Sequence, residues 1–327
     1  VYDAVTNELA ARDTIVAVNG KAGIDIKRDE DRMMFVYIVP IHQVTAPSPV
    51  FLLPGDRLRI SGKAGDPVFS GSEIYDGLAR FDGFRHIKAE IDSLYSRAGK
   101  IAENDIIGKQ SLNAEYDRLT AKRDSIYAQY IKENPNDLTS GYLTLFMDPA
   151  KGLDSYNLLG STVKESAMGE LLDMVAKSFT DIVIREKNKM NIQPGKPAPD
   201  FSLKGTDGKE YTLASFKGKY VLLDFWGEWC YWCMKGMPDM KKYYEKYKDQ
   251  IEFVGINCRD SEETWQKTVR EEGLVWTNLF NGDDTGLLNK YAVEGFPTKI
   301  LIDKEGKIVE VFVGESEDLY TKLDELF

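Results

Sequence analysis

Between residues 219 and 249 an apolar strand, a short loop with two cysteines and a helix follow one another, and this order constrains the fold more than any other feature of the chain. The stretch KYVLLDFW (219–226) is apolar enough to predict a strand that is buried on both faces. Cys230 and Cys233 come next, and the residues after them have the apolar spacing of a helix. We therefore expect Cys230 at the N-terminus of the helix that carries Cys233.

The same alternation of strand and helix continues to the end of the chain. A hairpin with a Thr-Asp-Gly turn is predicted in FSLKGTDGKEYTL (201–213), ahead of the cysteine segment. Strands that alternate with helices and end in a hairpin predict an α/β layered fold. After the cysteine segment, strands are predicted near 251–257, 275–279, 298–303 and 307–314, and helices near 262–271, near 285–292 and at the C-terminus.

A proline-rich segment separates this part from the rest of the chain. NIQPGKPAPD (191–200) holds three prolines and a glycine in ten residues, and a helix cannot continue through it. A chain of 327 residues is also long enough for two domains. We therefore predict an N-terminal β-plus-helical region over residues 1–190 and a C-terminal domain over residues 191–327.

The N-terminal region changes its hydrophobic period part of the way along. From about residue 13 to residue 70 apolar and polar residues alternate, which predicts a small, mostly antiparallel β-rich region. From residue 73 to about 190 the spacing is helical, with Ser111 as an expected N-cap and Asn134, before a proline, as a stop. The expected strands include GIDIKRD (23–29), MMFVYIV (33–39) and RLRIS (57–61), the last with Leu58 and Ile60 on one face.

Composition and charge exclude two classes of partner. The net charge is −11 and the chain has no cluster of Lys and Arg, so we expect neither nucleic acid nor an anionic membrane surface to bind. No apolar run approaches the roughly 18 residues that suggest a membrane span. Because the first residue is Val1 and not Met, we expect a processed or trimmed product that would lack any signal or lipid-anchor segment. His42 and His86 have no motif around them and are expected to be structural or solvated.

Four chemistries use two cysteines at the spacing of Cys230 and Cys233: a structural disulfide, a metal site, haem attachment and dithiol exchange. Haem attachment needs a histidine after the second cysteine, where this chain has Met234. A structural zinc site needs four ligands, and beyond the pair the chain has one cysteine and two distant histidines. A disulfide across two residues closes a very short loop and removes little chain entropy. Dithiol exchange is therefore favoured, and copper(I) binding with Met234, Met237 and Met240 is the alternative.

The expected place of the pair at a helix N-terminus supports exchange. Unpaired backbone N–H groups and the positive end of the helix dipole stabilise a thiolate there. The thiolate is the nucleophile of disulfide exchange. We therefore expect Cys230 to be the exposed thiol with a lowered pKa and Cys233 to be the buried one. Cys258, which ends the strand IEFVGINC, is expected to be a buried small hydrophobe.

Residues 219–238, KYVLLDFWGEWCYWCMKGMP, resemble the active-site segment of the thioredoxin superfamily. The resemblance includes Asp224 six residues before the first cysteine, Trp229 directly before it, and Pro238 five residues after the second. Further on, YAVEGFPTKILID (291–303) resembles the family's cis-proline segment. These matches in one order make the resemblance specific.

Two further segments resemble one branch of that superfamily. GKPAPDFSL (195–203), and the extra helix and strand between Asn257 and Tyr291, are similar to the TlpA/ResA-like bacterial extracytoplasmic thiol–disulfide oxidoreductases. Val313, with the glycine after it, matches the third loop of the family's substrate groove. The resemblance covers residues ~195–327. Residues 1–190 only loosely resemble the regions that precede such domains in bacterial envelope proteins.

The resemblance implies a thioredoxin fold for the C-terminal domain and thiol–disulfide exchange with protein substrates, without a cofactor. Cys230 would attack, Cys233 would resolve the mixed disulfide, and Asp224 would move the proton. Buried in its strand, Asp224 should have a raised pKa. The residues expected to bind substrate are Trp229, Tyr231, Trp232, Phe296 and Pro297, the last after a cis peptide bond.

The resemblance also implies partners and a compartment. The partners would be disulfide-bearing protein substrates and an upstream thiol reductase. The compartment would be the bacterial periplasm or cell envelope, and a lipoprotein anchor lost from the chain is compatible with it. The N-terminal region could then serve as a ligand- or partner-binding module, although nothing in its sequence names a ligand.

This chain departs from the family's pattern at several positions. Tyr231 and Trp232 stand between the cysteines, where Pro, Gly or Glu is usual. The lysine that thioredoxin carries after the active-site helix falls at Gly255, so no lysine is available there to offset the burial of Asp224. TlpA-like proteins often have Glu where this chain has Gly236. The peroxiredoxin motif P-x-x-x-T-x-x-C fits neither cysteine, because around Cys230 its positions hold Leu223 and Gly227, and around Cys233 they hold Trp226 and Cys230.

Overall fold

In a computed structural model, the chain is described over residues 2–6, 8–9, 32–38, 48–63, 66–102 and 104–327. The expected strand GIDIKRD and His42 lie outside these residues. The chain divides into two compact units, residues 1–180 and 181–327. The domain boundary after residue 190 stays a prediction. It lies just after helix α7 (Gly169–Asn188), which spans the division between residues 180 and 181.

The N-terminal unit combines short antiparallel strands with helices. Its first three strands form one sheet in the order β1-β2-β3, and β4 and β5 form a separate hairpin. The expected strand RLRIS (57–61) is found two residues later, as β4, and Ile60 in it is 47% exposed. Within the described chain β4 pairs only with β5. The strands are β1 (Tyr2–Asp3), β2 (Met34–Ile38), β3 (Ser48–Leu52), β4 (Arg59–Lys63) and β5 (Asp66–Ser70).

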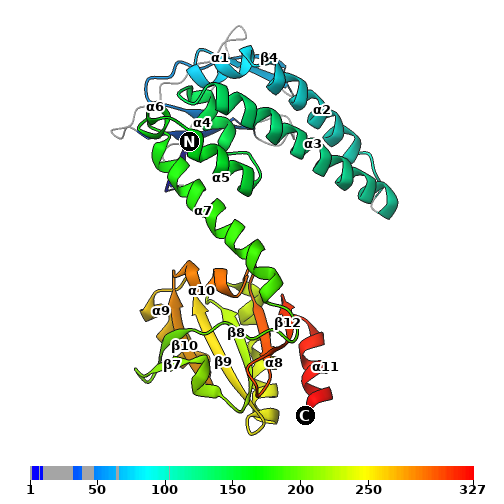
Figure 1. Cartoon of the computed structure of the whole chain (residues 1–327), viewed down its shortest axis with the longest axis vertical. Helices are drawn as coiled ribbons and strands as arrows, with labels where there is room; N and C mark the ends of the chain where they lie inside the picture. Colours follow the sequence, from blue (N-terminus) through cyan, green and yellow to red (C-terminus); the bar gives the residue numbers. More distant parts are fainter. Residues whose placement is uncertain (1, 7, 10–31, 39–47, 64–65, 103) are drawn as a thin grey trace. The chain divides into compact units, whose positions relative to one another are not determined.

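The helices of this unit supply most of its hydrophobic core. Helices α2 and α3 lie side by side as a hairpin (Figure 1). Helix α3 begins earlier than predicted, because Asp105 and not Ser111 caps it by accepting a hydrogen bond from the Gly108 N–H. It ends at Glu133, before Asn134, as predicted. The helices are α1 (Glu73–Arg80), α2 (Asp82–Ala98), α3 (Ile106–Glu133), α4 (Leu138–Thr144), α5 (Pro149–Leu158), α6 (Ser161–Lys164) and α7 (Gly169–Asn188), which runs on into the second unit.

The C-terminal unit is built on one seven-stranded mixed sheet in the order β12-β11-β8-β9-β10-β6-β7. Strands β8, β9 and β10 run parallel, and β11, β12, β6 and β7 join antiparallel to their neighbours. The predicted α/β layered fold is therefore confirmed. The strands are β6 (Ser202–Gly205), β7 (Glu210–Thr212), β8 (Tyr220–Trp226), β9 (Ile251–Cys258), β10 (Thr277–Gly282), β11 (Thr298–Ile302) and β12 (Ile308–Val313).

Helices cover both faces of this sheet (Figure 1). One hydrophobic cluster takes buried residues from α8, α9 and α11, and the other takes them from α10 and the segment before β8. Period-two alternation divides β8 between them: Leu222 and Trp226 belong to the first cluster, and Leu223 and Phe225 to the second. The helices are α8 (Tyr231–Tyr247), α9 (Glu262–Glu271), α10 (Thr285–Lys290) and α11 (Glu317–Leu326), with the short 3-10 turns η1 (Lys189–Asn191) and η2 (Leu213–Phe216).

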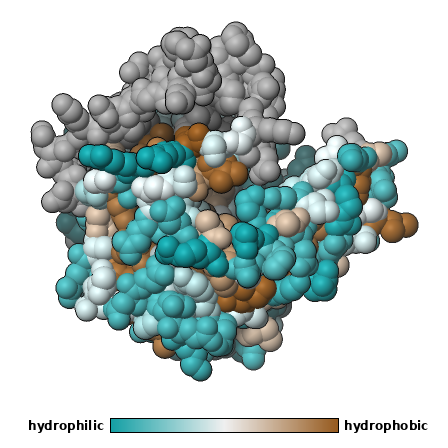
Figure 2. Space-filling model, turned by 90° about the horizontal axis from the view of Figure 1, so that it is seen from above, coloured by the Kyte–Doolittle hydropathy of each residue, from teal (hydrophilic) through white to brown (hydrophobic). Residues whose placement is uncertain are grey.

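In the view of Figure 2, hydrophobic side chains form separate groups among hydrophilic ones. Among the residues that the structure describes, no helix is both long and apolar enough to cross a membrane.

Candidate redox site

The two cysteines sit where strand β8 gives way to helix α8, and they are joined by a disulfide bond. Cys230 is the N-cap of α8, and its sulfur accepts a hydrogen bond from the Cys233 N–H at 3.2 Å. This is the helix N-terminus that the sequence predicted. Both residues are buried, with 5% of Cys230 and 3% of Cys233 exposed. The expected exposure of Cys230 is therefore not seen in the disulfide-bonded form.

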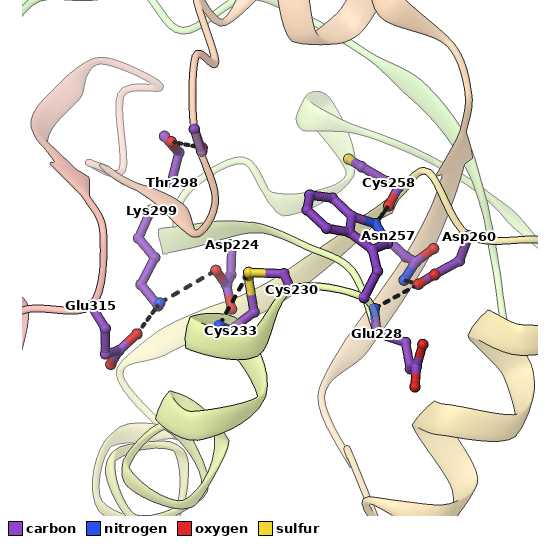
Figure 3. The surroundings of a disulfide bond; sticks show 12 residues. Asp224, Glu228, Cys230, Cys233, Asn257, Cys258, Asp260, Thr298, Lys299 and Glu315 are labelled. Atoms are coloured by element: carbon purple, nitrogen blue, oxygen red, sulfur yellow. Dashed lines mark hydrogen bonds and ion pairs between the residues drawn. A yellow bond between two sulfur atoms is a disulfide. The ribbon is translucent and has the colours of Figure 1, made fainter. Parts of the chain in front are cut away.

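Asp224 lies in the middle of β8 and faces the cysteines. Its neighbours two positions away, Leu222 and Trp226, pack in the same cluster as Cys230 and Cys233, so alternation puts the Asp224 side chain on that face. Figure 3 shows the carboxyl group beside the disulfide. Only 2% of Asp224 is exposed. Every residue of β8 after Tyr220 is buried, as the apolar run predicted.

Lys299 supplies the charge partner that the sequence analysis did not find. It lies directly opposite Asp224 on the neighbouring strand β11, and its Nζ atom is 3.6 Å from Asp224 Oδ1. Gly255 on β9 offers no lysine, as the sequence analysis stated, but β11 on the other side of β8 supplies one. The available signal was a single charged residue inside the apolar strand TKILI.

A second carboxylate completes this charged group. Lys299 Nζ donates a hydrogen bond to Glu315 Oε2 at 2.8 Å, and Tyr320 Oη donates one to Glu315 Oε1 at 2.9 Å (Figure 3 shows the lysine and both carboxylates). The Lys299 side chain is 3% exposed and that of Glu315 is 19% exposed. Asp224 Oδ1 is buried and has no hydrogen-bond partner in the described part of the chain. The lysine is therefore shared by two carboxylates and held closer to Glu315.

The pKa values of these groups follow from burial and from one another. Burial raises the pKa of Asp224, the Lys299 charge partly opposes this, and the Glu315 charge adds to it. Burial alone would lower the pKa of Lys299, but Asp224 and Glu315 more than offset it, and the pKa is raised. Burial, with a smaller effect of Glu315, also raises the pKa of Tyr320. The lysine thus stays protonated beside a carboxyl group whose charged form is disfavoured, as predicted for Asp224.

Aromatic side chains surround the loop that carries the cysteines. Trp229, Tyr231 and Trp232 are 45%, 68% and 55% exposed. Trp229 contacts Phe296 edge to face, with ring centroids 5.2 Å apart, and Phe296 is partly buried against the cluster that contains the cysteines. The peptide bond between Phe296 and Pro297 is cis, as predicted. The assignment of these residues to substrate binding stays a prediction.

Arg259 is a further residue at this face that the sequence analysis missed. Its guanidinium lies 5.5 Å from the Trp229 ring centroid and 5.1 Å from that of Phe296. Its φ of 65° is in the left-handed region, which is uncommon for a residue with a side chain. Nothing in its sequence context signals either feature.

Hydrogen bonds connect the loop before Cys230 to the end of strand β9. The Asp260 carboxylate accepts hydrogen bonds from the Glu228 N–H at 2.8 Å and from Asn257 Nδ2 at 2.6 Å. Trp229 Nε1 donates to the Cys258 carbonyl oxygen at 3.0 Å. These contacts tie the segment before the disulfide to the end of β9.

The remaining residues that the sequence analysis singled out lie in the hydrophobic core or on the exposed surface. Cys258 is fully buried, and burial raises the pKa of its thiol. Met237 and Met240, at 2% exposure each, pack in the core beneath the disulfide, and the copper(I) alternative stays a prediction. The described residues contain no group of three or more His, Cys, Asp or Glu side chains placed to hold a metal ion. His86 is exposed on α2.

Comparison with known proteins identifies relatives of the part of the chain that carries this site. The model of the AhpC/TSA family matches residues 194–311. The thiol-disulfide oxidoreductase ResA of Bacillus cereus is 38% identical over 131 residues, which are 40% of this chain and 74% of the relative. ResA of Geobacillus thermodenitrificans is 33% identical over 159 residues, which are 48% of this chain and 91% of the relative.

Solved structures include a similar domain. The thioredoxin domain of a thiol-disulfide oxidoreductase from Bacteroides vulgatus is 35% identical, with a TM-score of 0.39, and the match covers 41% of this chain and 97% of that one. The identity to the ResA proteins extends over most of their length, and the cysteine pair lies where strand meets helix. Through its C-terminal part, this chain therefore belongs to the thioredoxin-like thiol–disulfide oxidoreductases of the ResA/TlpA type.

Proposed function

We propose that this enzyme reduces disulfide bonds of protein substrates with the dithiol of Cys230 and Cys233. The observation that carries the proposal is the place of Cys230 as the N-cap of α8, with Cys233 close enough to be joined to it. A helix N-terminus stabilises the thiolate of the first cysteine, and a neighbouring second thiol can release the substrate.

The reaction consists of two exchanges of a sulfur–sulfur bond. The Cys230 thiolate attacks the substrate disulfide, forms a mixed disulfide and releases one substrate thiolate, which takes up a proton. Cys233 then gives its proton to Asp224, and its thiolate attacks the Cys230 sulfur. The Cys230–Cys233 disulfide forms and the second substrate thiolate leaves. The substrate gains the two electrons that the dithiol loses.

The surface around the pair supports a protein as substrate. Trp229, Tyr231 and Trp232 are large, exposed aromatic side chains beside the disulfide, and such side chains are typical of protein-binding surfaces. Phe296 and the cis Pro297 belong to the same proposed groove, where backbone of the substrate would lie next to Cys230. A small thiol would not need so extended an aromatic surface.

An enzyme that reduces disulfides needs a partner that donates electrons to it, and a compartment in which both act. A reductase leaves each turnover with its own pair oxidised, so an upstream thiol reductase must return two electrons to it. We place this cycle in the bacterial periplasm or cell envelope, as the resemblance to extracytoplasmic relatives suggests. The substrates would be envelope proteins with disulfides to be opened.

Two measurements test the proposal. The Cys233→Ser variant, expressed in a bacterial envelope, should accumulate mixed disulfides through Cys230, while Cys258→Ser, which alters the buried third cysteine, should not. The reduction potential of the 230/233 pair should be more negative than the roughly −180 to −120 mV of proteins that isomerise or form disulfides. An absence of mixed disulfides would overturn exchange, and a potential in the oxidising range would overturn the direction.

A further inference from the structure

Gly236 lies in the interior of helix α8, one turn after Cys233, and is buried. Glycine is a much poorer residue than alanine for a helix interior, so its presence needs a reason. A Cβ atom at this position would lie 2.4 Å from Cδ and from Oε2 of Glu315. The missing side chain therefore makes the space that the Glu315 carboxylate fills.

The Glu315 carboxylate is held in that space from two sides. Lys299 Nζ and Tyr320 Oη each donate a hydrogen bond to it, one to each oxygen. Glu315 itself comes from the turn after β12, Lys299 from β11 and Tyr320 from α11. Hydrogen bonds from two separate elements fix the carboxylate much more firmly than a surface ion pair would.

The same carboxylate controls where the Lys299 charge lies. Lys299 Nζ is 2.8 Å from Glu315 Oε2 and 3.6 Å from Asp224 Oδ1, so it makes a hydrogen bond to the first and only a longer ionic contact to the second (Figure 3). One buried cation thus serves two carboxylates. Without Glu315, the lysine would be free to move onto Asp224 and hold it in the charged form.

We propose that Glu315 is a positioning residue for disulfide exchange: by holding Lys299 away from full contact with Asp224, it keeps Asp224 able to take the proton of Cys233 and give it up again. This inference rests on the proposed function, because it assigns a role within the same reaction. Gly236 contributes to this arrangement, because only a residue without a side chain leaves room for the Glu315 carboxylate at this point.

The expected pH dependence follows from the groups around Asp224. The negative charge of Glu315 raises the pKa of Asp224, and the positive charge of Lys299 lowers it. Removing Glu315 should therefore let Asp224 lose its proton at lower pH, and removing the Lys299 charge should delay that loss to higher pH. The titratable or charged groups around Asp224 on its face of the sheet are Lys299 on β11, Glu315 after β12, Tyr320 on α11, and Cys230 and Cys233 at the start of α8. Cys258 on β9 packs in the cluster on the other face.

The first test follows the resolution step against pH. Reduced protein is mixed with a disulfide substrate in a stopped-flow instrument, and attack and release are resolved as separate phases. The release rate should rise with pH as Asp224 loses its proton, and this rise is the acidic limb of the pH profile. In Glu315→Gln the acidic limb should move to lower pH by ~1 unit or more, and in Lys299→Met it should move to higher pH. The attack phase should change less. A purely structural role would slow both variants without moving the two limbs in opposite directions.

The second test moves the carboxylate to a different position in the chain. In Glu315→Ala combined with Gly236→Asp, the new carboxylate would start from a Cβ atom within 2.4 Å of the old one and should return the acidic limb to within about 0.3 units of wild type. Gly236→Asn combined with Glu315→Ala has the same shape without the charge and should leave the limb displaced. This pair also covers the case in which Lys299→Met does not fold.

The outcomes separate this inference from the function itself. If the wild-type enzyme shows no release phase at all, the proposed function is wrong. If it shows a pH-dependent release phase and Glu315→Gln has the same limb as wild type, the function stands and the role of Glu315 is overturned. Equal recovery by Gly236→Asp and Gly236→Asn would likewise show that the charge is not what matters.

Discussion

Lys299 lies directly across from Asp224 on the neighbouring strand, with its Nζ atom 3.6 Å from the carboxyl oxygen and both side chains almost fully buried. A cation and a carboxyl group are thus placed together in the layer between the sheet and helix α8. Lys299 has a second partner in Glu315, so loss of Asp224 would not leave an unpaired buried charge. This distinguishes the site from a simple buried ion pair, where removal of one partner is strongly destabilising.

We expect Asp224→Asn to make the stability of the C-terminal unit less dependent on pH. Because the folded-state pKa of Asp224 is raised, its protonated form contributes stability that is fully present below about pH 3.8 and is lost as the pH rises through the folded-state value. The variant removes that titration, and each pKa unit of difference is worth about 1.4 kcal/mol. Denaturant unfolding between pH 5 and 8 measures the slope. The exposed Asp239→Asn is the control, and an unchanged slope in Asp224→Asn would contradict the expectation.

We expect Gly236→Ala to gain no stability, although alanine is the better helix former. The new Cβ must displace the Glu315 carboxylate, which breaks its hydrogen bonds to Lys299 and Tyr320 and offsets a propensity gain of about 1 kcal/mol. Gly295→Ala in the same unit is the control, because its Cβ would enter open space. Unfolding curves of both variants check this. A rise in midpoint for Gly236→Ala as large as propensity predicts would show that Glu315 moves aside freely.

We expect the three cysteines of the reduced protein to react with an alkylating reagent in the order Cys230, Cys233, Cys258. Cys230 caps helix α8, where its thiolate is stabilised, while burial raises the pKa of the fully buried Cys258. Labelling at mildly acidic pH followed by peptide mapping gives the order. Label on Cys233 before Cys230 would reverse their proposed roles, and early label on Cys258 would mean that the C-terminal unit opens under these conditions.

We expect residues 191–327 to fold alone and keep reductase activity, and residues 181–327 to be more stable by roughly 1–3 kcal/mol. The last turns of α7 bond to Asn289 on α10: its amide donates to Asp181 at 2.6 Å, and it accepts from Arg185 at 3.0 Å and from Asn188 at 2.9 Å. Denaturant unfolding of both fragments measures the difference.

Asn289→Ala provides the control for this comparison. It removes the two hydrogen bonds of the Asn289 side chain, to Asp181 and from Arg185, and leaves the one from Asn188 to its main-chain carbonyl. It should therefore reduce the advantage of the longer fragment and change the shorter one little, since the shorter one lacks all three partners. An inert or unfolded 191–327 fragment would place the domain boundary earlier, and equal stability of the two fragments would mean that α7 adds nothing to the C-terminal unit.

The sequence by itself determined the local structure of the C-terminal unit and the chemistry of its cysteine pair. The predicted helix at 262–271 coincides with α9, and the apolar run after residue 219 is strand β8. These elements are encoded by hydrophobic period and by caps, which act between residues near one another in the chain. The place of Cys230 at a helix N-terminus followed from the same local order, and the cis bond before Pro297 followed from the resemblance.

The errors in the N-terminal unit show the limit of such local reasoning. Alternation predicted a strand over residues 57–61 with Leu58 and Ile60 on one face, but the strand begins at Arg59 and Ile60 is 47% exposed, because whether a face is buried depends on what packs against it. Ser111 was a chemically sound cap, yet α3 could be extended back to Asp105, which caps it instead. Propensity allows several starts to a helix, and tertiary packing selects among them.

Only the tertiary structure decided the charged surroundings of the redox site. Period-two alternation shows that Asp224 and Lys299 each face one side of a strand, but it does not show that β8 and β11 are neighbours or that these two residues are in register. The contact of Glu315 with the space at Gly236 likewise joins a turn to a helix that are far apart in the sequence. Strand order, register and the fit of a side chain into a gap are properties of the packed chain as a whole, so no local pattern records them.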